Sequence, residues 1–595
     1  MRYWIYVLFC CITIIACSPE REKPTSVDGM GKKKMILYQI MTRLFGNANT
    51  HNSPYGSIEE NGVGKFRDIN NAALKSIKEL GVTHVWYTGV IEHATLTDYT
   101  SHGIPLDDAD VVKGRAGSPY AIKDYYDVNP DLATNISNRM QEFEDLVSRS
   151  HDEGLKVVID FVPNHVARSY RSDVKPREVK DLGETDDVSI AFSRDNNFYY
   201  LPGQSFQPPA VEANKFPHPT KDGKFQEVPA KVTGNNEFTA SPGIQSWYET
   251  VKLNYGVDIQ NNYTKYFDPV PDTWIKMRDI LLFWTRKKID GFRCDMAEMV
   301  PVEFWAWVIP QIKEENSGVI FIAEIYNPSE YRNYINRGRF DFLYDKVLLY
   351  DTLRLLLNGE RSTADIHEIQ KGLEGINHHM LHFLENHDEQ RVASKFFAGD
   401  PWRALPALVV SASIDRGPVM IYFGQEVGEP GQGAEGFQSD DGRTTIFDYW
   451  GVPEHQKWMN GGKFDGGQLS EEQKQLRRFY SELLSFVSTN EAIASGEYED
   501  VTLYNISSGN FPATVHAFLR YHEDERLLIV NSFSGTGLDI KVAIPPGVFH
   551  KTGMREEAIY IARDMLWRGV EVGLDKDHSF SLHLEPNSCF IFKIK

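Results

Sequence analysis

The chain has 595 residues and an ordinary globular composition, with 83 acidic and 63 basic residues that give a formal net charge of −20. An acidic chain whose Lys and Arg are dispersed argues against a nucleic-acid partner, because phosphate binding needs clustered basic side chains. The length exceeds that of a typical domain, so it indicates several domains or one large barrel with additions.

The first 17 residues have the form of a bacterial lipoprotein signal peptide. The apolar run from Ile5 to Ile15 is shorter than the roughly 20 residues that a transmembrane helix needs. It ends in Ile14-Ile15-Ala16-Cys17, which resembles the lipobox, in which the cysteine becomes the lipidated first residue after cleavage. We therefore expect a lipid on Cys17 that anchors the protein to a membrane of a bacterial cell envelope, on its periplasmic or surface side. A plain signal peptide or a short membrane anchor is the alternative.

A flexible tether is predicted for residues 18–34, which are polar and contain Pro and Gly. Once Cys17 is acylated, the mature chain keeps one further pair of cysteines, Cys294 and Cys589. We expect these two thiols to stay reduced and to pack as small apolar groups.

Eight short apolar runs follow the tether, and helical patterns separate most of them. The runs are MILYQIM (35–41), VTHVWYTG (82–89), KVVIDFV (156–162), IDGFRCD (289–295), GVIFIAEI (318–325), FDFLYD (340–345), MLHFLEN (380–386) and PVMIYFG (418–424). The helical patterns are 70–80, 136–153, 273–288 and 470–486. Continuously apolar strands that alternate with helices pair in parallel. Residues 35–489 are therefore predicted to form an α/β fold, a (β/α)8 TIM barrel.

Two regions depart from this alternation. Residues 166–270, rich in Asn, Pro, Gly and Lys, are predicted to be an inserted domain B after the third strand, which overhangs the barrel and walls a cleft. Residues 490–595 contain the short runs VTLYNI, TVHAFLRY, RLLIVNSF, DIKVAI and CFIFKIK, which predict an antiparallel β-sandwich. We expect this C-terminal domain to be a stabilising cap on the barrel, with carbohydrate binding as the alternative.

Polar residues at the ends of the predicted strands indicate the chemistry, because the carboxyl ends of the strands of a TIM barrel face its active site. In chain order they are Asp160, Asn164 and His165 after the third strand, Arg293 and Asp295 at the fourth, Glu324 at the fifth, and His387 and Asp388 after the seventh. Each residue alone is more often a loop or cap residue. Their joint occurrence predicts an active site.

Two carboxyl groups that flank one bond are what glycoside hydrolysis requires. We expect Arg293 to lower the pKa of Asp295 and keep it anionic, as a nucleophile must be. Burial after the apolar VIFIA and neighbouring carboxylates are expected to raise the pKa of Glu324 and keep it protonated as the acid. This pair of environments predicts a glycosidase.

Four ordered blocks resemble those of the α-amylase family, glycoside hydrolase family 13: DFVPNH, GFRCDMAEM, FIAEI and FLENHDEQR. The resemblance runs from about Ile36 to the C-terminus. It implies that Asp295 is the nucleophile, Glu324 the general acid/base and Asp388 the acid that stabilises the transition state. It also implies an α-glucan substrate, retention of anomeric configuration through a covalent glycosyl-enzyme, and a set of sugar-binding residues: Tyr120, His165, Arg293 and His387.

The chain departs from the family pattern in two places. The second block usually ends in Lys-His, but here it ends in Glu298-Met299, which puts the acceptor side of the cleaved bond and the product pattern in doubt. Many members also bind calcium. Asn164 fits one ligand of the usual site, whereas the loop ENGVGKF (60–66) lacks the aspartates that a hard cation prefers. No cofactor is expected to be required, and a structural calcium at Asn164 stays open.

Three functions follow from these observations. The leading one is a retaining hydrolase of α-glucosidic bonds, foremost α-1,4 bonds, in starch or maltodextrins. A transglycosylase with the same acids is the alternative, in which a sugar hydroxyl replaces water. A non-catalytic, membrane-tethered member is the third, although such members typically lack an acid that this chain keeps. Linkage preference, endo or exo action and oligomeric state stay open.

Overall fold

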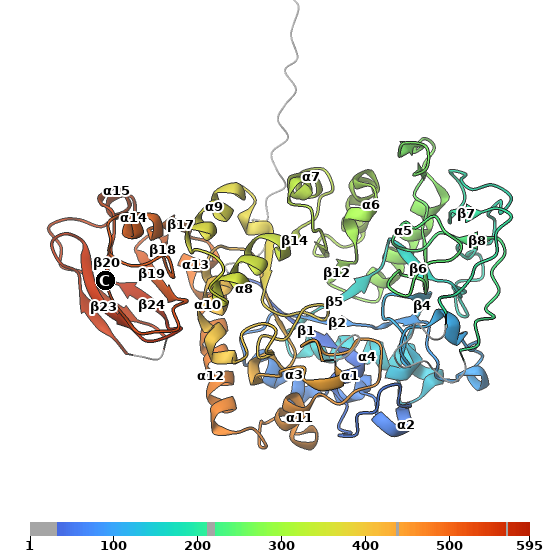
Figure 1. Cartoon of the computed structure of the whole chain (residues 1–595), viewed down its shortest axis with the longest axis horizontal. Coiled ribbons are helices and arrows are strands. Elements are labelled where there is room, and N and C mark those ends of the chain that lie inside the picture. Colours follow the sequence, from blue (N-terminus) through green and yellow to red (C-terminus); the bar gives the residue numbers. More distant parts are fainter. Residues whose placement is uncertain (1–32, 211–220, 436–439, 567–568) are drawn as a thin grey trace, which may run out of the picture. The chain divides into compact units, whose positions relative to one another are not determined.

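The computed structural model describes residues 33–210, 221–435, 440–566 and 569–595 (Figure 1). The predicted signal peptide, Cys17 and the predicted tether up to residue 32 lie outside the described residues. Among the helices of the described part, none is long and apolar enough to cross a bilayer. Lys34, at the end of the predicted tether, is buried, and its ammonium group donates a 2.7 Å hydrogen bond to the carbonyl oxygen of Asp415.

Eight parallel strands close into a barrel in which each strand pairs with the next barrel strand along the chain, and the last pairs with the first. They are β1 Ile36–Met41, β2 His84–Thr88, β5 Lys156–Phe161, β12 Gly291–Cys294, β13 Ile320–Ala323, β14 Phe342–Tyr344, β15 Met380–Phe383 and β16 Val419–Tyr422. Nearly all of their residues are buried, as expected for strands covered on both faces. Each predicted run contains one of these strands, so the predicted (β/α)8 barrel is confirmed.

Helices fill the intervals between the barrel strands (Figure 1). The longer ones are α3 Asn71–Lys78, α4 Arg139–Asp152, α5 Asp272–Arg286, α6 Val302–Glu315, α7 Tyr331–Asn336, α8 Asp351–Leu357, α9 Ala364–Gly372, α10 Leu405–Ser413, α11 Pro453–Met459 and α12 Glu471–Thr489; α1 Thr42–Phe45 and α2 Ile58–Asn61 are short. Side-chain caps fix several of their first turns. Asn70 accepts a hydrogen bond from the N–H of Ala73 at the start of α3, and Ser470 forms a capping box with Gln473 at the start of α12.

Two long segments extend from the barrel between its second and fourth strands. The first contains the antiparallel pair β3 Ile91–His93 and β4 Ile122–Val128, which the sequence patterns did not predict. The second is the predicted insertion, and its strands are β6 His165–Ala167, β7 Tyr200–Leu201, β8 Ala230–Lys231, β9 Thr250–Lys252, β10 Val257–Asp258 and β11 Thr264–Lys265. These strands pair as three short antiparallel ladders, so the insertion after the third barrel strand is confirmed.

The C-terminal region forms two antiparallel sheets. The six-stranded sheet has the order β17-β18-β19-β24-β21-β22, and β20 pairs with β23. The strands are β17 Glu497–Asp500, β18 Val515–His522, β19 Glu525–Ser532, β20 Leu538–Ala543, β21 Ile561–Asp564, β22 Glu571–Gly573, β23 Ser579–Leu584 and β24 Cys589–Ile594, with helices α13 Glu491–Ala494, α14 Thr502–Ser507 and α15 Pro546–Lys551. Leu528 and Phe592 of the larger sheet share one apolar core with Val542 and Phe580 of the smaller sheet. The predicted antiparallel β-sandwich is confirmed.

The prediction of a strand is wrong for one segment of the C-terminal region. The run VTLYNI forms helix α14, because Asp500 caps its first turn: Asp500 Oδ1 accepts hydrogen bonds from the N–H groups of Thr502 at 2.9 Å and Leu503 at 3.4 Å. Asn505 Nδ2 then donates to the carbonyl oxygen of Val501 and to that of Ala543 on β20. Contacts that are distant in sequence therefore override the local apolar alternation.

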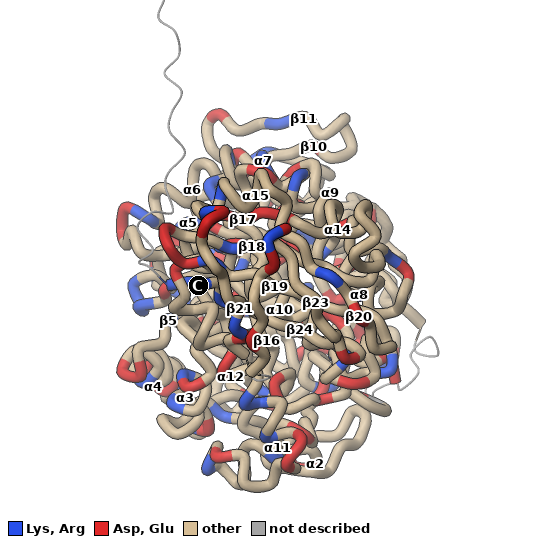
Figure 2. Tube along the Cα trace, turned by 90° about the vertical axis from the view of Figure 1, so that its left-hand side faces the viewer, with Lys and Arg blue, Asp and Glu red and all other residues tan. Residues whose placement is uncertain are grey.

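Arg520 on β18 links the C-terminal sheet to the barrel. Its buried guanidinium group donates to the carbonyl oxygen of Ile414, at the end of α10, at 3.1 Å. It also donates to three carbonyl oxygens around α13, those of Ala492, Ile493 and Gly496. Figure 2 looks onto this sheet and shows acidic and basic residues interspersed over it. The two buried cysteines, Cys294 on β12 and Cys589 on β24, are free thiols and form no disulfide.

A buried ionic network surrounds His382 on β15. The ring lies between two carboxyl groups, with Nε2 2.8 Å from Asp415 Oδ2 and Nδ1 3.1 Å from Asp345 Oδ2. Burial favours the neutral ring, but the two carboxylates prevail and raise the pKa of His382 to about 9. The charged histidine therefore joins the strands of the barrel to the loop that carries Asp415.

Replacing His382 with Gln is expected to cost stability at neutral pH and much less at alkaline pH. A group whose pKa is raised on folding stabilises the fold fully below its unfolded pKa, about 6.5, and this contribution is lost as the pH rises through about 9. The difference in unfolding free energy between wild type and variant should shrink by about 3 kcal/mol over that window, measured by urea denaturation. His102→Gln at an exposed position is the control, and a pH-independent difference for His382→Gln would contradict the charged network.

Candidate active site

Arg293 lies at the centre of the site and is completely buried on β12. Its guanidinium group contacts three carboxyl groups: Nη1 lies 2.9 Å from Asp295 Oδ1 and 3.3 Å from Asp160 Oδ1, and Nη2 lies 2.7 Å from Glu324 Oε2. Strand register brings these groups together, because Arg293 pairs with Asp160 on β5, and Glu324 directly follows β13, the other neighbour of β12. Anionic partners are what a buried cation requires.

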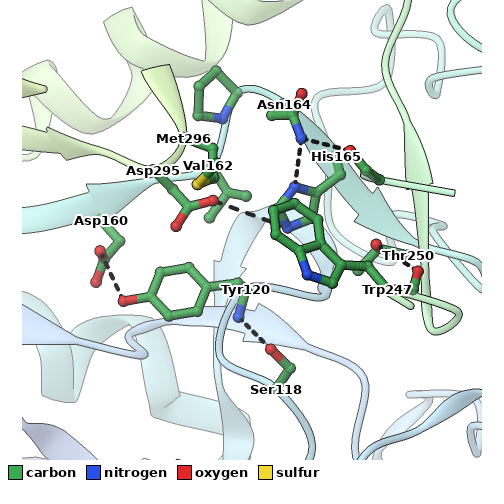
Figure 3. A network of polar contacts seen from close by, with 12 residues as sticks. Ser118, Tyr120, Asp160, Val162, Asn164, His165, Trp247, Thr250, Asp295 and Met296 are labelled. Atoms are coloured by element: carbon green, nitrogen blue, oxygen red, sulfur yellow. Dashed lines mark hydrogen bonds and ion pairs between the residues drawn. The ribbon is translucent and has the colours of Figure 1, made fainter. Parts of the chain in front are cut away.

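Asp295 directs one carboxylate oxygen toward Arg293 and the other toward His165. Its Oδ2 is buried, accepts no hydrogen bond from the protein, and lies 4.0 Å from His165 Nε2 (Figure 3). Burial and the neighbouring Glu324 carboxylate raise the pKa of Asp295 well above its usual range, and Arg293 offsets them only in part. The prediction that Arg293 lowers this pKa is wrong in its net direction, because the cation is shared with two other acids in the same buried space.

Glu324 is held by hydrogen bonds at both carboxylate oxygens. The hydroxyl of Tyr326 donates to Oε1 at 2.6 Å, and the backbone N–H of Met296 donates to Oε2 at 2.8 Å. Met296 follows Asp295 and has a φ of 44°, a left-handed conformation that is costly for a residue other than glycine. This strained turn aims its N–H at Glu324 and so fixes the geometry between the two acids.

Asp388 is the most accessible of the predicted catalytic acids. Its side chain is 36% exposed, whereas that of Asp295 is 8% exposed. Gln39 on β1 donates from Nε2 to His387 Nδ1 at 2.8 Å, which leaves the ring proton on Nε2, 3.0 Å from Asp388 Oδ2. Burial opposes ionisation of Asp388, but the interaction with His387 outweighs it and lowers the pKa of this carboxyl.

Tyr120 reaches the site from the segment before β4. Its ring stacks on His387 with the ring centroids 5.2 Å apart, and its hydroxyl lies 2.5 Å from His387 Nε2. The hydroxyl also lies 3.4 Å from Asp160 Oδ1 (Figure 3). Asp160 also accepts a 3.0 Å hydrogen bond from the indole N–H of Trp86 on β2. The aromatic ring predicted to contact sugar is therefore held by His387 and Asp160.

His165 stands beside the open oxygen of Asp295 as a neutral ring. Burial and the nearby Lys252 lower the pKa of His165 to about 3. Asn164 Nδ2 donates to His165 Nδ1 at 3.0 Å, so the ring proton lies on Nε2 and faces Asp295. Trp247, from the insertion, packs against the His165 ring with centroids 5.2 Å apart (Figure 3).

The structure therefore brings all of the predicted catalytic and sugar-binding residues into one connected network, and it adds residues that the sequence did not single out. Tyr326 directly follows the third block, two positions after Glu324, and could have been found there. Gln39 is a polar residue within the apolar first strand, and this contrast could have indicated a functional position. Trp247 lies in the irregular insertion, and no sequence pattern indicated it.

Asn164 does not fit a calcium ligand in this chain. Its Oδ1 accepts a hydrogen bond from the amine of Lys252 on β9, and its Nδ2 donates to the carbonyl oxygen of Gly234 at 2.9 Å. Lys252 is buried and also donates to the carbonyl oxygen of Met299 at 3.0 Å. Burial lowers the pKa of Lys252 to about 7, and both forms of the amine can donate these bonds. A basic side chain thus occupies the position of a metal, and the calcium that the sequence left open at Asn164 is not supported.

Glu298 and Met299 occupy the turn after β12 where the family pattern has Lys-His. Glu298 Oε2 accepts a 3.0 Å hydrogen bond from the backbone N–H of Asn327, three residues beyond Glu324. Burial raises the pKa of Glu298 despite this bond. The chain therefore places an acid, held against the loop that carries Glu324, where relatives with the usual pattern carry two basic side chains.

A (β/α)8 barrel with carboxyl groups gathered around a buried arginine at the carboxyl ends of its strands has the architecture of a glycosidase. A model of the alpha-amylase catalytic domain matches residues 39–457, which is more than half of the chain. The chain belongs to the alpha-amylase family, and it is a glycosidase of that family.

Relatives with two kinds of activity are similar to this chain. It is 22% identical over 525 residues to Alpha-amylase 3 of Dictyoglomus thermophilum, covering 84% of this chain and 85% of that protein. It is 23% identical over 407 residues to a 4-alpha-glucanotransferase of Thermotoga maritima, covering 67% of this chain and 73% of that protein. The fold also resembles the crystal structure of an alpha-amylase from H. orenii, with a TM-score of 0.59 and 18% identity over 95% of this chain and 100% of that one.

Replacing Lys252 with Met is expected to destabilise the protein by about 2 kcal/mol, because it leaves the side-chain oxygen of Asn164 and the carbonyl oxygen of Met299 buried without a donor. The measurement is thermal unfolding with and without calcium, and the deficit should be equal in both buffers. The control is Lys265→Met, which removes only a surface ion pair with Glu303. A deficit that calcium selectively abolishes would show instead that a metal competes for this place.

Proposed function

We propose that the protein is a retaining hydrolase of α-glucosidic bonds in α-glucans such as starch or maltodextrins, with α-1,4 bonds as its main substrate. The observation that carries this proposal is the unpartnered Asp295 Oδ2, which is buried beside Arg293 and His165 while both oxygens of Glu324 are held by donors. A carboxylate oxygen without a partner is free to form a bond. The names of the relatives support the α-glucan class of substrate.

In the proposed reaction, Asp295 Oδ2 attacks the anomeric carbon while Glu324 donates its proton to the glycosidic oxygen, which leaves as a hydroxyl of the departing chain. A covalent glycosyl-enzyme on Asp295 results. Glu324, now a carboxylate, takes a proton from water as the water oxygen attacks the same carbon and releases Asp295. Two inversions give net retention, and the enzyme returns to its first state.

The protonation state that this reaction needs is one proton shared by Asp295 and Glu324. The two carboxyl groups contact the same arginine. Burial and the neighbouring carboxylates raise the pKa of Asp295, which favours its protonated form in the free protein. A bound sugar that leaves its glycosidic oxygen near Glu324 favours the proton there, and Arg293 then stabilises the Asp295 anion.

We assign the positions around the pair to sugar binding. The anion of Asp388, whose pKa is lowered beside His387, is suited to accept hydrogen bonds from sugar hydroxyls, and His387 and His165 offer Nε2–H donors. Tyr120 presents an aromatic face for stacking. Positive charge that develops on the sugar ring in the transition state is stabilised by the nearby carboxylates.

Transfer to a sugar hydroxyl is the second candidate, and Glu298 is the observation that favours it. The acceptor side of the bond lacks the two basic residues of the usual family pattern, and one similar protein is named as a glucanotransferase. The same acids serve both reactions. Which acceptor prevails depends on how well this side of the site holds a sugar relative to water.

We also propose that the enzyme acts at a bacterial cell envelope, tethered to a membrane by a lipid on Cys17. The support is the sequence of the first 17 residues, with its short apolar run and lipobox-like end. A tether of polar residues would let the catalytic domains reach polymeric substrate beyond the membrane surface.

The proposed activity predicts α-configured products from amylose and maltotriose, followed by proton NMR as they form, with slower release from pullulan if α-1,4 bonds are preferred. Asp295→Asn should lose roughly 10³-fold or more of turnover while its far-UV circular dichroism and Tm stay near those of the wild type. Asp279→Asn on the outer helix α5 is the matched control. Products longer than maltotriose would favour transfer, and first-formed β-anomers would exclude retention.

The two acids can be separated with an α-glucosyl fluoride, whose fluoride leaves without a proton donor. Glu324→Gln should still form the glycosyl-enzyme from it, detected by intact-protein mass spectrometry as one added glucosyl unit, because only the nucleophile is needed. Asp295→Asn should show no such adduct. An adduct on Asp295→Asn and none on Glu324→Gln would reverse the two assignments.

Lipidation predicts that Cys17→Ala moves the protein from the membrane fraction to the soluble fraction of an expressing bacterium, with unchanged activity per molecule. Mass spectrometry of the N-terminal peptide of the wild type should find an acylated Cys17. Cys589→Ala, at a buried position of the C-terminal sheet, is the control for loss of a thiol. A wild-type N-terminus without acyl chains would rule out the lipid anchor.

A further inference from the structure

A second group of acidic side chains lies on the β3–β4 pair, outside the active site. Glu92 on β3 and Asp124 and Asp127 on β4 each contribute a carboxylate oxygen, and these oxygens lie within 4.8 Å of one another. The exposed fractions are 1% for Glu92, 0% for Asp124 and 2% for Asp127. Among the described residues, no other group of three or more acidic, His or Cys side chains has this spacing.

Glu92 is the unexplained member of this group. Both of its carboxylate oxygens are buried, and neither has a hydrogen-bond partner in the protein. Burial and the charges of Asp127 and Asp124 raise the pKa of Glu92 well above its usual range. Asp173, at the start of the insertion, also has a buried and unpartnered Oδ2, and its charge acts on both Glu92 and Asp124.

The basic side chains nearby are engaged elsewhere. Arg139 binds Asp127 Oδ2 through Nε at 2.8 Å, and Lys123 Nζ pairs with Asp107 at 3.1 Å. These two cations leave Glu92 and Asp173 without a direct counter-charge. Carboxylates buried close together without one repel each other and lose their hydration, which is a strongly destabilising arrangement.

We propose that Glu92, Asp124 and Asp127 bind a hard divalent cation, Ca²⁺, and that the negative charge of the nearby Asp173 strengthens this binding. The donor set is all oxygen and anionic, which suits Ca²⁺ and excludes soft metals that prefer thiolate or imidazole. The site differs from the possible calcium position at Asn164, which Lys252 occupies. The ion supplies the positive charge that the unpartnered oxygens of Glu92 and Asp173 lack.

The position of the ion connects it to the active site. Asp124 Oδ2 already accepts a 2.8 Å hydrogen bond from the backbone N–H of Asp173, so the ion joins the β3–β4 pair to the first part of the insertion. Tyr120 lies just before β4 and stacks on His387. Calcium would therefore hold in place the segment that presents Tyr120, without contacting substrate itself.

The test is calorimetric titration of CaCl2 into the divalent-free protein, together with its Tm at increasing calcium. The wild type should bind one Ca²⁺ per chain and gain roughly 3 °C in Tm when free calcium is about 100 times Kd, with the gain growing as the logarithm of free calcium above Kd. Glu92→Gln should lose this binding and this gain. In calcium-free buffer Glu92→Gln should melt no lower than the wild type, because the neutral amide removes the repulsion between Glu92 and the carboxylates beside it.

Two further variants complete the design, and both readouts are independent of turnover. Asp173→Asn should weaken calcium binding about tenfold, and it replaces Glu92→Gln if that variant fails to fold. Asp145→Asn, an exposed acid on α4, should bind calcium as the wild type does. The proposal is overturned if millimolar calcium neither binds to the wild type nor raises its Tm, or if Glu92→Gln and Asp173→Asn bind it as tightly as the wild type.

Discussion

The buried guanidinium group of Arg293 is the constraint on which the active site depends. A cation with no exposed surface must be surrounded by anions, and the parallel register of β5, β12 and β13 supplies them as Asp160, Asp295 and Glu324. The same charge that stabilises the fold then sets the chemistry. It orients the carboxyl groups of Asp295 and Glu324, and one oxygen of Asp295 remains without a hydrogen-bond partner.

Other buried charges in the described residues follow the same rule with different partners. Arg520 is paired with backbone carbonyl oxygens between the barrel and the C-terminal sheet, and His382 with two aspartates. Lys252 donates hydrogen bonds to Asn164 Oδ1 and to the carbonyl oxygen of Met299. These bonds join the insertion to the barrel at a position where a metal could otherwise do so. Glu92 departs from this rule because neither of its carboxylate oxygens has a partner in the protein, and we therefore propose a bound cation there.

The site combines rigid and variable parts. Asp295 and Glu324 follow barrel strands directly, where the ladder of parallel hydrogen bonds fixes their positions. Other side chains of the candidate site come from longer connections: Tyr120 from the segment before β4, Trp247 from the insertion and Glu298 from the turn after β12. A family that keeps the acids and changes these connections can change substrate and acceptor without altering the bond-breaking step.

The sequence by itself determined the barrel and the identity of the site. Eight apolar runs gave the eight strands, and acids at the strand ends were placed together because parallel strands end at one face. Only the tertiary structure decided the net direction of the pKa shift of Asp295 and the helix formed by VTLYNI. It also decided the contact of Lys252 with Asn164 and the grouping of acidic side chains on the β3–β4 pair. Each of these depends on burial and on neighbours distant along the chain, whereas local periodicity records only which face of a strand or helix is apolar.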